Sequence, residues 1–469
     1  MTTAPLSTAA RRMLAIPEAA RSVGPMSSFK FMTWNALAQT LVRRELYPYC
    51  TKAQLKWKSR KQRLLAEFEF YRPDVACFQE IDRDFWLTDW APVLDKLSYH
   101  WRFFGYPTKN HGCCLVWRSD TWSCLDYRPV LIDQSQTVAN YVLTTDNVAQ
   151  VAVLCRHAEG VKAAENQNES HTSTFQPSAS ADSAQAHAFT SEPSWSPRSI
   201  IPPGGEALIV SNTHLYWNPQ GGFNRLAQGL VIHRTIAELN QPHQNQLPVV
   251  MAGDFNTTPV EGLYPALHHQ LDAPGLVSNL MNYLRRDPRL FTLRYDPDQR
   301  LYLNDSQTEL PDPAAQPLST QDHAHLSLEQ QNALVCALLD GYRKYPPARS
   351  VYQNYDQCDP AHFEPIPEPV HRELNDLTET LVIYQADEWH GEPRFSTFTQ
   401  FRSLLDYIMV LDPPSQTDNI SAETVIRPLA LLSIPKEELL VPGLPNDSFP
   451  SDHLSLLADL GFFRNGPRD

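Results

Sequence analysis

Two short motifs, one in the middle of the chain and one near its C-terminal end, carry residue types suited to phosphate chemistry. Asp254 and Asn256 follow an apolar run, and Asp452 and His453 precede another one. Carboxylates bind hard cations and orient water, while imidazole and amide groups hold phosphate oxygens. The position of these residues at the ends of buried strands predicts a site for metal-assisted cleavage of phosphate esters.

Four more polar residues, Asn35, Glu80, His214 and Asp406, lie at the boundaries of other apolar runs. Taken singly, each has an ordinary structural explanation as a turn residue, surface carboxylate, core histidine or helix cap. Strands that run in opposite directions bring opposite ends to one edge of a sheet, so these residues can meet at a single rim. We therefore interpret them as parts of one site.

The elements that position these residues alternate between strand-like and helix-like patterns, which predicts an α/β fold with mixed sheets in a sandwich. Residues 112–117, 121–130 and 148–154 are expected to be antiparallel strands. The other strands are expected at 29–34, 74–78, 207–214, 249–256, 404–411 and 454–460, and helices at 57–71 and about 224–239. Ser327 and Gln330 form a capping-box pattern, which predicts one further helix.

The domain organisation follows from shifts in composition. Residues 1–28 are expected to be a disordered tail or a weak mitochondrial presequence. Residues 29–463 are expected to form a single domain with polar insertions at about 157–205 and 283–380, the first of them disordered. No leucine-rich repeat is present, so nothing in the sequence predicts assembly into a deadenylase complex through such repeats.

The composition limits the partners and the compartment. The chain has 469 residues, 42% of them hydrophobic, and a net charge of −14, so contact with RNA requires a local basic patch. The candidate patch, with an ordinary solvated helix face as its alternative, is Lys56, Lys58, Arg60, Lys61 and Arg63. Eight cysteines without zinc-binding spacing indicate reduced thiols. We expect an intracellular protein of the cytoplasm or nucleus, with the mitochondrion as the alternative, and no membrane-spanning segment.

Together these motifs resemble those of the endonuclease/exonuclease/phosphatase superfamily. The resemblance rests on Trp34–Ala38, Gln79–Glu80, Thr213–Leu215, Gly253–Asn256, Leu405–Ile408 and Phe449–His453. Arg44–Pro48 and Leu444–His453 are similar to the branch of the carbon-catabolite-repressor-type deadenylases, nocturnin, Angel proteins and fungal Ngl RNases, and Lys56–Lys58 is most similar to the Ngl members. The resemblance covers roughly residues 29–156, 206–270 and 390–463. It implies a DNase I-like four-layer α/β-sandwich, in which two mixed β-sheets are flanked by helices.

The resemblance also implies which residues hold a metal. Glu80, helped by Asn35, would bind a divalent cation, with Mg²⁺ expected and Mn²⁺ as the alternative. Asp254 would orient and deprotonate the attacking water and could contact a second metal. Asp452 is a candidate for a further metal or water ligand.

The resemblance implies that four further residues bind the phosphate or stabilise its charge, directly or through a neighbour. Asn256 and His214 would bind its non-bridging oxygens. His453 would stabilise the charge that develops on the phosphoryl group. Asp406 would keep the His453 imidazole protonated, because a nearby carboxylate raises the pKa of a histidine.

The resemblance implies that two residues, Pro219 and Phe401, take part in selecting the substrate. They match positions that flank an adenine base in the deadenylases, and ordinary packing is the alternative. Ser396-Thr397 stands where the deadenylases carry Thr-Asn, a departure that bears on poly(A) selectivity rather than on hydrolysis.

The expected function is a Mg²⁺-dependent 3′-to-5′ exoribonuclease that acts on RNA with adenine-containing 3′ ends and releases 5′-nucleotides. RNA 3′ processing and poly(A) shortening are the expected settings. One alternative is a phosphatase or phosphodiesterase acting on a small nucleotide or a 2′,5′-oligoadenylate. The other is a non-catalytic RNA-binding adaptor on the same scaffold.

Overall fold

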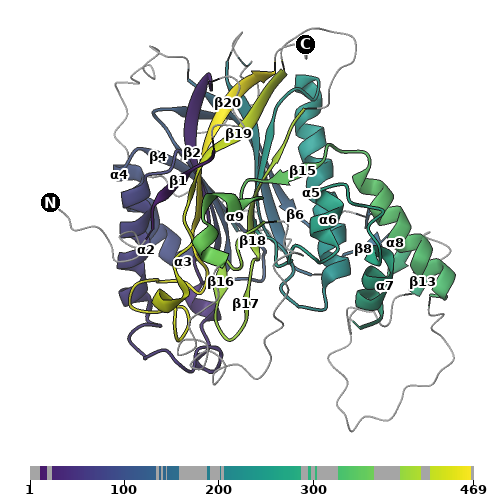
Figure 1. Cartoon of the computed structure of the whole chain (residues 1–469), viewed down its shortest axis with the longest axis horizontal. Helices are drawn as coiled ribbons and strands as arrows, with labels where there is room; N and C mark the ends of the chain where they lie inside the picture. The colour runs from purple at the N-terminus through teal and green to yellow at the C-terminus, as the bar shows by residue number, and fades with distance from the viewer. Residues whose placement is uncertain are drawn as a thin grey trace, which may run out of the picture.

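Two mixed β-sheets packed face to face form the centre of the molecule (Figure 1). The computed structural model describes residues 11–17, 24–133, 137–138, 141–143, 145–157, 187–190, 201, 205–286, 294–296, 301–303, 326–363, 391–413 and 423–465. The first sheet has the order β1-β19-β20-β2-β3-β5-β4-β10 and the second the order β15-β18-β12-β11-β9-β6. In each sheet one central pair is parallel, β2 with β3 and β11 with β12, and its other pairs are antiparallel.

The strands and helices have the following bounds. The first sheet consists of β1 (Met13–Ala15), β2 (Ser27–Asn35), β3 (Val75–Asp82), β4 (Tyr99–Gly105), β5 (His111–Arg118), β10 (His187–Thr190), β19 (Glu423–Leu432) and β20 (Leu456–Asn465). The second consists of β6 (Trp122–Leu131), β9 (Val148–Arg156), β11 (Ala207–His214), β12 (Val249–Asp254), β15 (Ala348–Ser350) and β18 (Asp406–Leu411). Short strands β7 (Thr137–Val138), β8 (Tyr141–Val142), β13 (Arg294–Asp296) and β14 (Leu301–Leu303) form a third sheet, and β16 (Thr397–Phe398) pairs with β17 (Arg402–Ser403). The helices are α2 (Trp57–Tyr71), α3 (Arg83–Phe85), α4 (Ala91–Lys96), α5 (Gly222–Asn240), α6 (Leu263–Leu267), α7 (Leu276–Arg286), α8 (Leu328–Tyr342) and α9 (Tyr355–Cys358).

The helices cover the outer faces of both sheets, which makes four layers (Figure 1). Successive side chains of a strand point to opposite faces, and β2 shows the consequence. Phe31 belongs to the core between the sheets, whereas Met32 belongs to the core under α2 and α4. Because both faces are buried, these strands are continuous apolar runs rather than alternating ones. The predicted two-sheet sandwich flanked by helices is confirmed.

Several elements match their predicted positions. The amphipathic helix expected at 57–71 is α2, and the helix expected at about 224–239 is α5. The capping box at the start of α8 is formed as predicted, because Ser327 Oγ accepts from Gln330 N at 3.2 Å and Gln330 Oε1 accepts from Ser327 N at 2.8 Å.

The two predicted insertions are partly built into the sheets. Most of 157–205 lies outside the described residues, but β10 within it pairs with β4 at the edge of the first sheet. The second insertion supplies β15, which pairs with β18 at the edge of the second sheet. Single short edge strands carry little periodicity, so composition alone did not reveal them. Among the described residues, no helix is both long and apolar enough to cross a membrane.

The prediction of a disordered tail is wrong for Arg11–Ile16. β1 pairs with β19, and the Arg11 side chain is fully buried. Its guanidinium donates to Ser433 O at 2.8 Å, Ser455 Oγ at 2.8 Å and Ser455 O at 2.6 Å, and it lies 3.6 Å from Glu67 Oε1. These contacts attach the N-terminal segment to the start of β20, two residues after His453.

Arg11→Ala is expected to destabilise the protein by roughly 3–5 kcal/mol, because it leaves the Glu67 carboxylate buried without its partner. Urea unfolding followed by circular dichroism measures the change. Arg12→Ala is the matched control, since the neighbouring side chain is exposed. Equal unfolding midpoints for the two variants would show that the segment does not contribute to the fold.

Candidate active site

Strand pairing brings three of the predicted residues side by side. Asp254, at the end of β12, lies in register with His214 on the parallel strand β11 and with Asp406 on the antiparallel strand β18. The carboxyl ends of the two parallel pairs and the start of β18 therefore meet at one end of the sandwich. The Asn35 side chain joins the two sheets there, donating from Nδ2 to Asp254 Oδ2 at 2.9 Å.

The direction of the Glu80 side chain follows from an irregularity in strand β3. The register of β3 against β5 shifts between Phe78 and Ile81, and Glu80 has a φ of 52°. Such a bulge bends the strand and turns a side chain out of its regular alternation. The preceding Gln79 stays fully buried and donates to Asn212 Oδ1 at 2.8 Å. The bulge thus directs the Glu80 carboxylate toward the site.

The Gly253–Asn256 turn is equally constrained. Gly253 has a φ of +144°, and a Cβ there would lie 1.9 Å from Thr213 O, so no other residue fits. Asn256 has a φ of 49°, and its backbone N–H donates to Asp254 Oδ1 at 2.9 Å. Its side-chain Nδ2 donates to Leu215 O at 3.0 Å. The turn holds the Asp254 and Asn256 side chains in fixed positions beside His214.

The carboxylates of Glu80 and Asp254 form a pair that suits a divalent cation. Asn35 Nδ2 bridges them, at 3.0 Å from Glu80 Oε1 and 2.9 Å from Asp254 Oδ2. In the described chain, the only side-chain bases within ion-pairing distance of them are His214 and His453. Burial raises the pKa of Glu80 above its ordinary value, although the His214 imidazole opposes the shift. Two largely enclosed carboxylates without a lysine or arginine partner among the described residues are the surroundings that a hard cation stabilises.

Asn35 and Asp452 were predicted to take part in metal binding, and these roles stay predictions. The Asn35 amide nitrogen faces the carboxylates, while its Oδ1 accepts from Leu37 N at 3.0 Å. Asp452 Oδ2 accepts from Tyr47 Oη at 2.8 Å, at the edge of the same site. Tyr47 was not singled out by the sequence, although it lies inside the Arg44–Pro48 motif.

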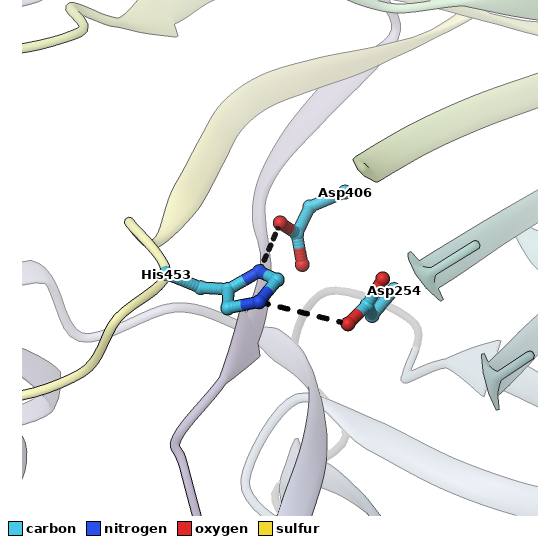
Figure 2. A group of neighbouring side chains, drawn as sticks. All are labelled: Asp254, Asp406 and His453. Carbon is cyan, nitrogen blue, oxygen red and sulfur yellow. Dashed lines mark hydrogen bonds and ion pairs between the residues drawn. The ribbon is translucent and has the colours of Figure 1, made fainter. Parts of the chain in front are cut away.

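His453 and Asp406 form a buried hydrogen-bonded pair (Figure 2). His453 Nδ1 lies 2.7 Å from Asp406 Oδ2, and its Nε2 lies 3.8 Å from Asp254 Oδ2. Burial alone would lower the pKa of His453, but the Asp406 and Asp254 carboxylates and the hydrogen bond to Asp406 raise it well above its ordinary value. The imidazole is therefore held as a cation between two carboxylates.

Ser396 positions Asp406 and was missed as a functional residue. Its Oγ donates to Asp406 Oδ2 at 2.6 Å and accepts from the N–H groups of Leu405 and Asp406, each at 3.0 Å. The potential ligand atoms of Asp254, Asp406 and His453 lie within 4.8 Å of one another. Since Asp406 Oδ2 already accepts from Ser396 and lies 2.7 Å from His453 Nδ1, we interpret this group as an orienting hydrogen-bond network. The metal-binding role of Glu80 and Asp254 stays a prediction.

The predicted basic patch at Lys56–Arg63 is wrong for three of its five members. Arg60 is fully buried and donates to Pro450 O at 2.6 Å and to Ala36 O and Leu37 O at 2.5 Å each. Lys61 pairs with Asp89, and Arg63 donates to Asn446 O. Arg60 thereby holds together the loop after Asn35 and the loop before His453. Only Lys56 and Lys58 are exposed cations of this set.

The two residues predicted to flank a base, Pro219 and Phe401, are exposed on the loop after His214 and the turn before Asp406, and Phe401 is 52% exposed. Buried Arg225 donates to Tyr216 O at 3.0 Å and Asn218 O at 2.6 Å, which fixes the loop after His214. Trp217 on that loop is 68% exposed and was not singled out by the sequence. The base-binding role of Pro219 and Phe401 stays a prediction.

The model of the endonuclease/exonuclease/phosphatase family matches residues 32–453. The chain therefore belongs to this family and is a hydrolytic enzyme of the nuclease type, and the family is generally dependent on a divalent metal.

Among curated proteins, the chain is similar to a probable RNA exonuclease of Schizosaccharomyces pombe, with 26% identity over 96% of this chain and 80% of that protein. It is also similar to the RNA exonuclease NGL2 of Saccharomyces cerevisiae, with 24% identity over 92% of this chain and 78% of that protein. A solved structure of ANGEL2, described as a 2′,3′-cyclic phosphatase, matches with a TM-score of 0.52 and 21% identity over 93% of this chain and 97% of that one. The catalytic domain of human nocturnin matches with a TM-score of 0.50 and 17% identity over 98% of this chain and all of that one. These two structural matches support the fold, and the resemblance stated from the motifs is confirmed.

Proposed function

We propose that this chain is a Mg²⁺-dependent exoribonuclease that shortens RNA from the 3′ end and releases 5′-nucleotides. The observation that carries the proposal is the joining of two half-sites at one end of the sandwich: the Asn35-bridged carboxylates of Glu80 and Asp254, and the His453–Asp406 pair. The two yeast relatives, both named as RNA exonucleases, support RNA as the substrate.

Each site residue has its own role in the proposed hydrolysis. Bound Mg²⁺ would supply Lewis-acid polarisation of the phosphate, and Glu80 and Asp254 would hold it. Asp254 orients the attacking water and accepts its proton. His453, kept cationic by Asp406, donates a hydrogen bond to a phosphoryl oxygen as negative charge accumulates there. His214 and Asn256 bind the remaining phosphate oxygens. The water oxygen bonds to phosphorus as the bond from phosphorus to the 3′-oxygen breaks, and the 3′-oxygen takes a proton from solvent to become the 3′-hydroxyl of the shortened RNA.

The competing function is a phosphatase or phosphodiesterase on a small nucleotide, which the description of ANGEL2 as a 2′,3′-cyclic phosphatase keeps open for this scaffold. The same residues would serve both substrates, because both reactions develop charge on a phosphoryl group. We favour RNA because both yeast relatives are named as RNA exonucleases. Adenine-containing 3′ ends are favoured because Pro219 and Phe401 are exposed and lie five residues along the chain from His214 and Asp406, which leaves both free to contact a base.

Digestion of 5′-labelled oligo(A), oligo(U) and a structured RNA with a mixed 3′ tail tests the proposal. With Mg²⁺ we expect a ladder of products shortened from the 3′ end, with 5′-nucleotides released and faster loss of oligo(A); with EDTA we expect intact RNA. A parallel panel contains phosphomonoesters, a 2′,3′-cyclic phosphate end and 2′,5′-oligoadenylate. Phosphate release from the panel with all three RNAs intact would overturn the exoribonuclease proposal in favour of the small-substrate enzyme.

A further inference from the structure

A group of exposed cations lies on the segment that follows the site residue Asn35. We call these five side chains the basic rim: Arg43, Arg44, Lys52, Lys56 and Lys58. Glu45 is the only acid between the first and the last of them, in a chain whose net charge is −14. None of the five forms an ion pair with a residue that the structure describes, so their charges remain available to a partner.

The basic rim is fastened to the loop that carries Asp452 and His453. Besides the bond from Tyr47 Oη to Asp452, Tyr49 Oη donates to Leu444 O at 2.6 Å and Gln54 Nε2 donates to Asp447 Oδ1 at 2.9 Å. A small apolar core formed by Leu37, Tyr47, Cys50 and Leu55 packs the segment from within. The segment that carries the cations is therefore anchored to the loop of Asp452 and His453 and is not a free loop.

We propose that the basic rim binds the phosphodiester backbone of RNA on the 5′ side of the nucleotide being removed. This inference rests on the proposed exoribonuclease function and extends it from the terminal nucleotide to the body of the substrate. An RNA whose 3′ end occupies the site must continue past the surrounding rim, and a positively charged track next to a phosphodiester-cleaving centre matches the repeated charge of that backbone.

The basic rim is expected to bind the phosphate charges of RNA without distinguishing its bases. Trp57, which lies between the rim residues Lys56 and Lys58, stacks on Phe85 with ring centroids 4.7 Å apart and donates from Nε1 to Asp89 Oδ2 at 2.7 Å. Because the Trp57 ring is already stacked and hydrogen-bonded within the protein, we do not expect it to stack on an RNA base. Lysine and arginine contacts to phosphates position a nucleic acid without identifying its bases, so any adenine preference must arise at the terminal nucleotide.

The test compares Lys52→Gln/Lys56→Gln with the control Lys96→Gln/Lys344→Gln, which removes two exposed lysines at the end of α4 and in the turn after α8. Oligo(A) and the dinucleotide ApA are the substrates, since ApA has no backbone beyond the scissile bond. For oligo(A), we expect KM of the rim variant to rise on the order of tenfold at about 0.15 M salt, and the slope of log kcat/KM against log salt to become shallower by about 1.4. Activity on ApA and all parameters of the control variant are expected to match the wild type.

The outcomes separate the two proposals. Unchanged oligo(A) kinetics and salt slope in the rim variant would overturn the rim as a backbone contact, with the exoribonuclease function left intact. An equal loss on ApA would also overturn it, because the effect would then belong to the catalytic site. Failure of the wild-type protein to cleave either substrate would overturn the proposed function itself.

Discussion

Asp254→Asn is expected to lower the rate of phosphodiester hydrolysis by at least about 10²-fold, the scale of one lost transition-state contact. Three side chains surround Asp254 Oδ2. The nitrogen atoms are Asn35 Nδ2 at 2.9 Å, His214 Nε2 at 3.5 Å and His453 Nε2 at 3.8 Å. The substitution removes the group proposed to orient and deprotonate water, which is also one of the two carboxylates proposed to hold the metal. The measurement is kcat/KM on oligo(A) over a Mg²⁺ titration.

Folding is expected to survive this substitution, because it removes a buried negative charge from a site where carboxylates already repel one another. Thermal unfolding followed by circular dichroism checks that point. Glu80→Gln should lose activity to a similar degree, whereas Asp272→Asn, at a 90%-exposed aspartate side chain, should behave like the wild type. Wild-type activity in Asp254→Asn would assign the measured hydrolysis to another site or to a contaminant, and would revive the non-catalytic alternative.

Asp406→Asn is expected to cost roughly 10²–10⁴-fold in rate while leaving the Glu80 and Asp254 carboxylates in place. The Asp406 carboxylate is a main cause of the raised pKa of His453, so its removal lowers that pKa. In the wild type, the imidazolium persists through neutral pH and is lost only as the pH rises through the raised pKa. In the variant it is lost at a lower pH, so the alkaline limb of the kcat/KM profile should shift downward.

A double-mutant cycle with His453→Ala separates this mechanism from a general loss of structure. If Asp406 acts through His453, the double variant should be no slower than His453→Ala alone. Independent, additive losses would instead show that Asp406 supports the site by another route. A pH profile of Asp406→Asn that coincides with the wild type would contradict the assignment of Asp406 as the residue that keeps His453 charged.

The match between prediction and structure was best where the signal was local and periodic. α2 begins and ends where its helical spacing predicted, and α8 begins at its capping box. The buried strands were visible as apolar runs because both of their faces are covered. Elements of three or four residues, such as β1, β10 and β15, were not predicted, because pairing with a neighbouring strand stabilises them and their own sequence carries almost no period.

Charge was the property most often misjudged from the sequence. Arg60 and Arg11 lie in segments that looked solvated, yet both guanidinium groups are buried and bind backbone carbonyls of loops far away in the chain. Ser396 looked like a departure that affects substrate choice, but its hydroxyl orients Asp406. Charged side chains are usually exposed, and these two are buried because distant segments supply acceptors for their guanidinium groups, which the local sequence does not show.

The sequence by itself determined which residues can do the chemistry and that they stand at the ends of buried strands, since residue type and the boundaries of apolar runs are local properties. Tertiary structure alone decided how those residues face one another. The bulge that turns Glu80, the register that sets His214, Asp254 and Asp406 in line, and the Asn35 bridge between the sheets all depend on contacts between distant segments. Such contacts form only when the two sheets pack, because packing is what places the strand ends within hydrogen-bonding distance.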